Sequence, residues 1–334
     1  SLPLSWLSRL HGTPSIGPAL SDLIGDRLRG VPPELRNCLE VIALGEPLAL
    51  RVAERLLDRE PLESLEELGL IHVTESLSGS VLTAAHPIWG QVVRATTPRL
   101  RVRRVQLELA RAIENGPRPS DQVRAALWRL DADAADDPAS LAVAAGVART
   151  LSLTIAERLA RASVDADPTV SSVTLLASIL TSNGEPEQAA AFLAALPPAE
   201  LSAEDRELVL FMRSVGTGLL GGDPKAALAM LDGPGNSTRL RGMQSSLLLL
   251  DGRVHDAYRA AAKVLDDPDA DESARTVAGI GAVGSLFYLG RFDEMRSRTE
   301  VAELDATHEL VANPNGLGQI QVNAFPALAE SGEL

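Results

Sequence analysis

Lysine, cysteine and aromatic residues are scarce in this chain of 334 residues, and each scarcity excludes a class of site or fold. Only two lysines occur, Lys225 and Lys263, and neither follows the glycine of a Gly-x-x-x-x-Gly-Lys-Ser/Thr loop, so the sequence has no P-loop for nucleotide phosphates. The single cysteine, Cys38, excludes an intrachain disulfide framework. Phe, Trp and Tyr make up 3% of the chain, which is poor material for a large β-sheet.

Long apolar runs are missing as well. The run from Leu141 to Ala148 is among the longest, and it falls far short of the ~18–20 residues that a membrane-spanning helix needs. The N-terminus has no basic start followed by an apolar stretch, so no secretory signal is visible. Because a lone cysteine also fits a reducing compartment, we expect a soluble, cytoplasmic protein.

Positive charge is in the minority and is unevenly distributed. The chain has 31 Lys and Arg against 45 Asp and Glu, a formal charge of −14. Residues 1–130 carry 16 arginines against 15 acids, whereas residues 131–334 carry 15 bases against 30 acids. This balance argues against a nucleic-acid role for the whole surface, and the acidic second part favours a basic or amphipathic partner.

Helix-forming residues dominate, and they predict a mainly α protein. Residues 1–19 are rich in Pro, Gly and Ser and are expected to be a lead-in loop. Helices are predicted from Pro33 to Leu44, from Leu48 to Leu57 and from Leu62 to Leu68. The runs 70–74 and 81–84 then read as two strands joined by a tight turn. Helices followed by a β-hairpin are the winged-helix arrangement.

The remainder of the chain reads as helical hairpins. A short helix at 88–95 and a longer one at 100–113 complete a winged-helix-like domain at 20–115, and a helical connector follows at 116–170. From residue 171 to 334 a helix repeatedly ends in Gly, and an Ala follows five positions later. The pairs are Gly184 and Ala189, Gly222 and Ala227, and Gly252 and Ala257, with Gly290 followed by Met295 as a departure. The glycine spacings of 38, 30 and 38 residues bracket the 34-residue tetratricopeptide (TPR) period, which predicts a degenerate TPR-like, right-handed α-helical solenoid.

Direct DNA binding is not expected from the predicted winged helix. Its third helix, Leu62–Leu68, holds Glu63, Glu66 and Glu67 and no base, so phosphates would repel it. The predicted wing tip, residues 78–80, carries no charge either. A packing role inside a larger protein is the favoured interpretation.

The segment Leu82-Thr-Ala-Ala-His86-Pro-Ile-Trp-Gly-Gln-Val-Val-Arg-Ala95 carries a resemblance to a known family. It resembles the F-x-H-P-L-x-x-x-x-V signature that follows the winged helix in LuxR-family STAND (signal-transduction ATPase) transcriptional regulators. The similarity covers about residues 18–115, and the TPR-like part resembles their sensor region more loosely. Such proteins are implied to contain an NTPase, a winged helix, a helical-repeat sensor and a C-terminal helix-turn-helix. This chain lacks the P-loop and a basic C-terminal helix-turn-helix, so it resembles the central part.

The resemblance implies roles for a histidine and a group of arginines. In related ATPases a His at the position of His86 contacts the ADP phosphate, so ATP or ADP is implied for a whole protein of this kind. The alternative is that His86 only caps the helix that follows. The arginines around the next helix are candidates for docking the NTPase domain or the acidic repeats, and a solvated arginine-rich face is the alternative: Arg94, Arg99, Arg101, Arg103 and Arg104.

Other motifs carry no chemistry by their context. The remaining histidines are scattered without ligand spacing, so no metal site is expected. The run Gly279–Gly284 matches Gly-x-Gly-x-x-Gly, but it lies within a predicted helix, where small residues allow close helix packing. Cys38 is expected to be an inert buried thiol.

These observations predict a non-catalytic regulatory part of a STAND LuxR-type transcriptional regulator. Its repeats would present a concave groove to a protein, a peptide or a small inducer, and the winged helix would relay binding to an NTPase domain outside this chain. A free-standing TPR-like interaction scaffold is the alternative. An enzyme has no supporting group of residues, and neither a membrane role nor a cofactor of this chain itself is expected.

Overall fold

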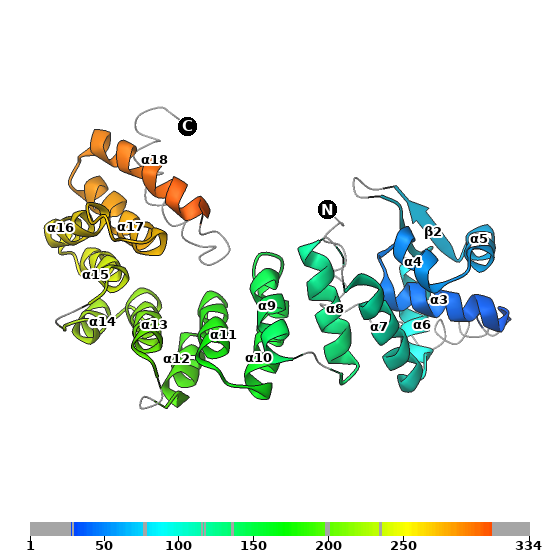
Figure 1. Ribbon diagram of the computed structural model, residues 1–334. Coiled ribbons are helices and arrows are strands. Elements are labelled where there is room, and N and C mark those ends of the chain that lie inside the picture. Colours follow the sequence, from blue (N-terminus) through cyan, green and yellow to red (C-terminus); the bar gives the residue numbers. More distant parts are fainter. Residues whose placement is uncertain are drawn as a thin grey trace. The chain divides into compact units, whose positions relative to one another are not determined.

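The computed structural model describes residues 28, 30–75, 79–114, 116, 118–134, 137–197, 201–233 and 236–308. The predicted lead-in loop 1–19 lies outside these residues. The chain divides into two compact units, with the boundary between Ser163 and Val164. The mainly α prediction is confirmed, since the described residues form helices and one small three-stranded sheet (Figure 1).

The first unit begins with a helical module around a small sheet. In chain order its elements are α3 (Pro33–Gly45), β1 (Leu48–Ala49), α4 (Leu50–Leu56), α5 (Arg59–Glu67), β2 (Ile71–Thr74), β3 (Val81–Ala84), α6 (Pro87–Thr96) and α7 (Arg99–Ile113). Helix α3 contacts α5, α6, α7 and β3, and is therefore the central helix of the module. Its Leu39 and Ile42 are fully buried, together with Leu65, Ile71 and Leu82 from the surrounding elements.

The sheet contains the predicted hairpin and one strand that the sequence did not reveal. Strands β2 and β3 pair antiparallel from Ile71 with Ala84 to Thr74 with Val81. The predicted helix from Leu48 to Leu57 is wrong at its start, because Leu48 and Ala49 form β1 against Leu82 and Val81. The sheet order is β1-β3-β2, so the middle strand is the last in sequence. The side chain of Leu48 is buried in the core, and this burial stabilises the pairing of the short strand β1 with β3.

Helix α5 also differs from its prediction. It begins at Arg59 rather than at Leu62, and Arg59 pairs with Glu63 one turn later at 3.0 Å. The helix ends at Glu67, one residue before its predicted end at Leu68, and Gly69 beyond it adopts φ +65°, a conformation that favours glycine. Leu62 and Leu65 face the core, while the glutamates remain exposed.

Three further helices follow α7. They are α8 (Pro119–Asp131), α9 (Pro138–Ala148) and α10 (Leu153–Ala166), which crosses the boundary between the two units. Helix α8 packs on α7 and α9 packs on α8. The predicted domain boundaries at 115/116 and 170/171 stay predictions.

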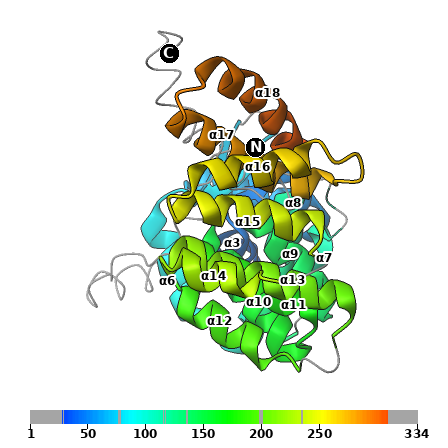
Figure 2. The same ribbon diagram turned by 90° about the vertical axis from the view of Figure 1, so that its left-hand side faces the viewer.

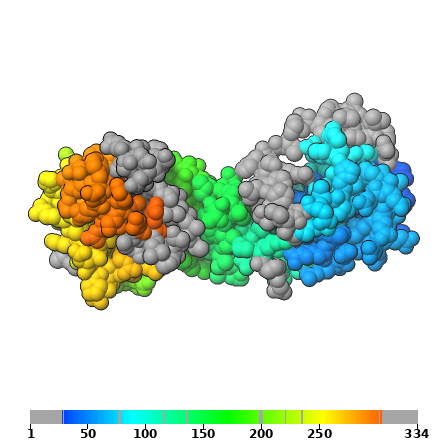
Figure 3. Space-filling model, turned by 90° about the horizontal axis from the view of Figure 1, so that it is seen from above, coloured from blue at the N-terminus to red at the C-terminus, as the bar shows by residue number. Residues whose placement is uncertain are grey.

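The second unit is a series of helical hairpins. Its elements are α11 (Val170–Ser182), α12 (Pro186–Ala195), α13 (Ala203–Ser214), the π-helix η1 (Val215–Leu220), α14 (Pro224–Met230), α15 (Thr238–Leu250), α16 (Val254–Leu265), α17 (Glu272–Tyr288) and α18 (Phe292–His308). The first helices of successive hairpins contact one another, α11 with α13, α13 with α15, and α15 with α17. Figure 2 shows these hairpins in successive layers, and in Figure 3 α15–α18, yellow to orange, form one continuous body.

The hairpin turns follow one hydrogen-bonding scheme. Gly184, Gly252 and Gly290 have φ between +69° and +80°, which ends each first helix without strain on a side chain. The residue after each glycine donates its N–H to the carbonyl five residues earlier; Glu185, for example, donates to Leu180 at 2.9 Å.

The turn at Gly222 is a variant of this scheme, because a π-helix precedes it. Asp223 donates to the carbonyl of Thr217, six residues back, at 3.1 Å. A Cβ at Gly218 would overlap the side chain of Leu247 and lie 2.9 Å from the Cβ of Ala227. The glycine therefore allows η1 to approach α14 and α15 closely.

The Gly-x-Gly-x-x-Gly run packs helices, as predicted. A Cβ at Gly279 would lie 2.8 Å from the Cβ of Ala302 in α18, and a Cβ at Gly281 would overlap Ser245 in α15. Helix α17 is thus held between its neighbours at close range.

Candidate functional site

His86 lies at the junction of β3 and α6, where its side chain caps the helix. The residue is exposed, has an extended backbone and precedes Pro87, the first residue of α6. Its Nδ1 accepts a hydrogen bond from the N–H of Ile88 at 3.2 Å. The capping alternative is therefore present in the structure.

The cap also determines which ring nitrogen of His86 can act on a partner. In the neutral imidazole, an Nδ1 that accepts a hydrogen bond leaves the proton on Nε2. The Nε2–H is then a donor at the N-terminus of α6, where the helix dipole favours an anion. Capping and contact with a phosphate use different nitrogens, so one does not exclude the other.

A buried ion pair fastens α6 to α3 near this junction. The Glu46 side chain is 2% exposed and accepts from Arg94 Nη1 and from the backbone N–H of Ala84, both at 2.8 Å. Arg94 Nη1 also donates to the carbonyl of Ala43 at 2.8 Å. Gly90 leaves room for the carboxylate, because a Cβ there would lie 2.6 Å from Glu46 Oε1. The pair joins the end of β3, helix α6 and the end of α3.

A buried arginine of α8 binds the same loop through its backbone carbonyls. Arg124 of α8 donates to the carbonyls of Gly45 and Pro47, the latter at 3.1 Å, and its guanidinium lies 4.7 Å from the ring centroid of Trp128. The Glu46–Pro47 peptide between these carbonyls is cis. Burial lowers the pKa of Arg124 to about 10, so the side chain stays charged at neutral pH.

The other predicted docking arginines lie along α7. Arg101 binds Glu40 and Asn37 of α3, both at 2.8 Å, and Arg103 Nε donates to the carbonyl of Ala132 at 2.7 Å. Arg104 is exposed and lies 3.8 Å from Glu108 one turn away, and Arg99 is exposed at the start of the helix. Arg94, Arg101 and Arg103 therefore hold elements of the first unit together. A docking role stays a prediction for all five arginines.

A cavity of about 410 Å³ lies between α3 and the α6–α7 junction. Its polar side chains already make contacts within the unit: Asn37 and Glu40 accept from Arg101, and the Thr96 and Thr97 hydroxyls donate to carbonyls of α6. The lining residues are Leu28, Pro33, Arg36, Asn37, Glu40, Val93, Thr96, Thr97 and Pro98.

The structure places the predicted repeat residues at the hairpin turns. The turn glycines Gly184, Gly222, Gly252 and Gly290 all have positive φ. The small residue five positions later faces the hairpin interior, with exposed fractions of 3% for Ala189 and 0% for Ala227 and Ala257. Met295, which replaces alanine at this position of the last hairpin, is 1% exposed, so a longer side chain fills the same place.

Other residues considered from the sequence lie apart from these sites. Cys38 is buried in α3, and burial is the main cause that raises the pKa of its thiol; its burial is as predicted, and its inertness stays a prediction. His72 and His255 are exposed on different units, and in the described ranges no three His, Cys, Asp or Glu side chains are grouped to hold a metal ion. Among the described helices none has the length and apolar character to cross a membrane.

Comparisons with known proteins give distant similarity at the level of structure only. No protein-family model and no curated protein sequence matches the chain. Among solved structures it is similar to a signal-transduction ATPase with numerous domains (STAND) from Pyrococcus horikoshii, described as having a tetratricopeptide repeat sensor, at 13% sequence identity and a TM-score of 0.35. The similarity covers 94% of this chain and 56% of that one, so the chain spans a little over half the length of that protein.

Proposed function

We propose that this chain is the regulatory part of a STAND, LuxR-type transcriptional regulator, in which α11–α18 bind a protein, a peptide or a small inducer. The observation that carries the proposal is the array of helical hairpins with glycine-closed turns, joined in one chain to a helical module with a small sheet. Hairpin arrays of this kind expose extended surfaces for partners. The winged-helix-like first module relays binding to an NTPase domain outside this chain.

The nucleotide belongs to that NTPase domain, and His86 is the contribution of this chain. An exposed imidazole with its Nε2–H directed away from the cap fits an anionic phosphate oxygen. The chain itself is neither an ATPase nor a direct DNA-binding module under this proposal. The exposed glutamates of α5 support the lack of direct DNA binding, since their negative charge would repel a phosphate backbone.

A thermal-shift screen of the purified chain against metabolites and peptides tests the sensor proposal. A ligand of the native state raises the melting temperature by mass action. Hydrogen exchange of the complex should then show protection within α11–α18 and a changed exchange rate near His86. Protection confined to residues 30–134, or a complete lack of ligands, would contradict the sensor role.

A free-standing scaffold is the second candidate, favoured by the hairpin array alone. The same exchange experiment separates the two. A partner that protects α11–α18 and leaves exchange around α6 unaltered indicates a scaffold, because no signal reaches the first module.

A further inference from the structure

The turn between α3 and β1 is held by side chains from two other helices. We call its residues, Gly45, Glu46 and Pro47, the α3–β1 turn. Arg124 of α8 donates to the carbonyls of Gly45 and Pro47, the first and last residues of the turn. Arg94 of α6 donates to the carboxylate of Glu46 between them. The turn is therefore bonded to α8 through its backbone and to α6 through its charged side chain.

The bonds of Glu46 fix the chain on both sides of His86. The carboxylate accepts from the backbone N–H of Ala84, the last residue of β3, at 2.8 Å. Two residues later His86 caps α6 by accepting from the N–H of Ile88. Because the same carboxylate holds the end of β3 and, through Arg94, the last turn of α6, it helps to determine where His86 lies.

The α3–β1 turn has little room to move independently of its neighbours. A Cβ at Gly45 would lie 2.9 Å from Cδ2 of Leu109 in α7, and a Cβ at Gly90 of α6 would lie 2.6 Å from Oε1 of Glu46. The backbone of the turn therefore packs directly on α7, and the carboxylate packs directly on α6. Close-packed interiors have low compressibility, so they transmit a displacement from one element to the next.

Burial makes the hydrogen bonds of Arg124 and Glu46 costly to break. Arg124 is 6% exposed, and the side chain of Glu46 is 2% exposed. A buried charged group that loses its hydrogen-bond partners cannot replace them with water, so separation costs more than a joint shift. If α8 moves, the response of lower energy is that the turn follows Arg124, and that the end of β3 and α6 follow Glu46.

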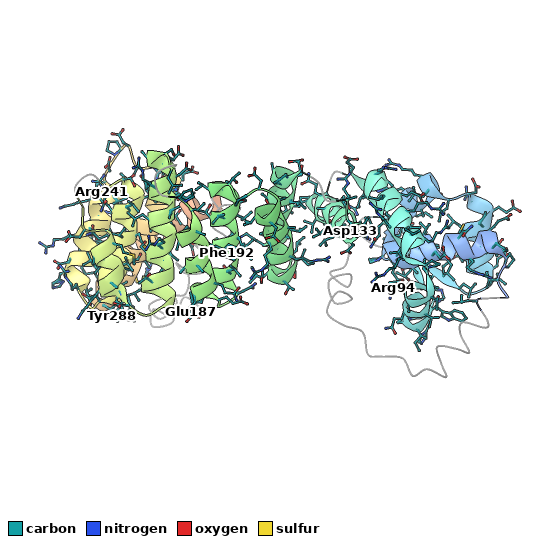
Figure 4. All side chains as sticks on the ribbon, turned by 90° about the horizontal axis from the view of Figure 1, so that it is seen from below. Arg94, Asp133, Glu187, Phe192, Arg241 and Tyr288 are labelled. Carbon is teal, nitrogen blue, oxygen red and sulfur yellow. The ribbon has the colours of Figure 1, made fainter. Side chains whose placement is uncertain are left out.

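Helix α8 is the element of this group that is closest in sequence to the second unit. It packs on α7, and α9 and α10 follow it as far as the boundary after Ser163. Figure 1 shows α8 beside α7, and Figure 4 marks Arg94 of α6 and Asp133, which follows the end of α8. Along the chain, a structural change that spreads from the second unit reaches α8 before any other element that is bonded to the turn.

We propose that Arg124 and the α3–β1 turn form the mechanical link by which a displacement of α8 moves the β3–α6 junction that carries His86. Arg124 moves the turn through two carbonyls, and Glu46 transmits the displacement to Ala84 and Arg94. The inference rests on the proposed function, because it names the residues through which the first module relays a signal. It predicts an energetic coupling between α8 and the junction that acts equally in both directions.

Hydrogen exchange of backbone amides in the full chain, followed by NMR, measures this coupling without a ligand. The reporter is the N–H of Ala84, which is bonded to Glu46, and the N–H of the buried Leu65 in α5 reports opening of the whole module. In Arg124→Met we expect the exchange rate at Ala84 to rise about tenfold relative to that at Leu65. Arg124→Lys keeps a charged donor but loses the fork that spans two carbonyls, so it should raise the same ratio by about threefold. This second variant keeps the test decisive if Arg124→Met does not fold.

Arg129→Met is the matched control on the same helix. Arg129 Nη2 pairs with Glu114 at the end of α7 at 3.0 Å, and its side chain is 17% exposed. Its loss removes an ion pair of α8 and should change the ratio of Ala84 to Leu65 exchange by less than about twofold. If the substitutions at Arg124 and Arg129 raise the ratio equally, or if neither changes it, Arg124 only stabilises the fold and the proposal is wrong.

The reverse measurement starts from the junction. Glu46→Gln should raise the exchange rate at the N–H of Trp128 in α8 by about threefold relative to that at Leu65, since a coupling free energy acts equally on both of its sites. An unchanged ratio would mean that the displacement does not pass through Glu46, and it would also overturn the proposal. The sensor proposal fails by a different outcome, the lack of any ligand that protects α11–α18 in hydrogen exchange, so the two failures are distinguishable.

Discussion

Removal of Arg94 should cost the first unit far more stability than removal of any surface arginine. In Arg94→Met the Glu46 carboxylate, 2% exposed, keeps the N–H of Ala84 as a donor and loses its cationic partner. Breaking a buried pair from one side costs roughly 3–5 kcal/mol. The Arg94 side chain is itself 32% exposed, so water reaches part of the vacated space. We therefore expect the low end, about 3 kcal/mol.

The partner substitution Glu46→Gln should cost less, about 2 kcal/mol. It removes the negative charge of Glu46 and leaves one of the two donors to this side chain without an acceptor. Both carboxylate oxygens of Glu46 accept from donors, Arg94 and the Ala84 N–H, whereas an amide offers a single oxygen. In Glu46→Gln/Arg94→Met neither charge of this pair remains. The double substitution should then cost about 2 kcal/mol, which gives a coupling energy of about 3 kcal/mol.

Urea unfolding followed by tryptophan fluorescence measures these free energies. All three tryptophans, Trp6, Trp89 and Trp128, belong to residues 1–163, so the signal reports the first unit alone. Arg104→Met is the matched control. Its side chain is 57% exposed and 3.8 Å from Glu108, and its loss should change stability by less than about 0.5 kcal/mol.

The reasoning is refuted if the two single losses add in the double substitution to within about 0.5 kcal/mol. Additivity would mean that Arg94 and Glu46 act independently, so that neither leaves the other unsatisfied.

Three smaller predictions follow. Gly252→Ala should destabilise the second unit by about 1 kcal/mol because its φ is +78°, while Gly146→Ala, with no atom within 4 Å of the new Cβ, should be neutral or stabilising; thermal unfolding followed by circular dichroism measures both. Cys38 should react with Ellman's reagent in the native chain far more slowly than in urea, because burial covers the thiol and raises its pKa; equal rates would contradict this. The hydrogen bond from Arg253 is the main cause that lowers the pKa of Asp256, so its stabilising effect is present above about pH 3.9 and is lost as the pH falls through the lower folded-state pKa. Urea midpoints of the second unit should therefore fall less steeply toward acid in Asp256→Asn than in the unsubstituted chain, and identical acid profiles would count against the assignment.

Features of the first module that depend on distant partners could not be read from the sequence. Strand β1 has two residues, too few for any periodicity, and exists because Leu48 and Ala49 pair with β3 more than thirty residues later. The carboxylate partners of Arg94 and Arg101 are 48 and 61 positions away in the sequence. The sequence therefore shows these arginines only as members of one cluster of positive charge. Sequence reasoning did reach His86, whose place before Pro87 at a helix start is a local signal.

In the second unit the sequence revealed the turns but not the surface. The π-helix before Gly222 has no local signature besides its glycines. Large apolar side chains are usually buried, yet Tyr288 is 70% exposed at the end of α17, and no local pattern distinguishes it from the partly buried Phe287 beside it.

The sequence by itself determined the helices, the β-hairpin and the glycine-closed turns. Each depends on the conformational preference of a few neighbouring residues, such as the freedom of Gly252 to adopt positive φ. The tertiary structure alone decided which arginines bind carboxylates and carbonyls of other elements in the first unit. It also decided where β1 pairs and which aromatic rings face solvent. These outcomes depend on burial and on contacts between residues far apart in the chain, and no local preference encodes them.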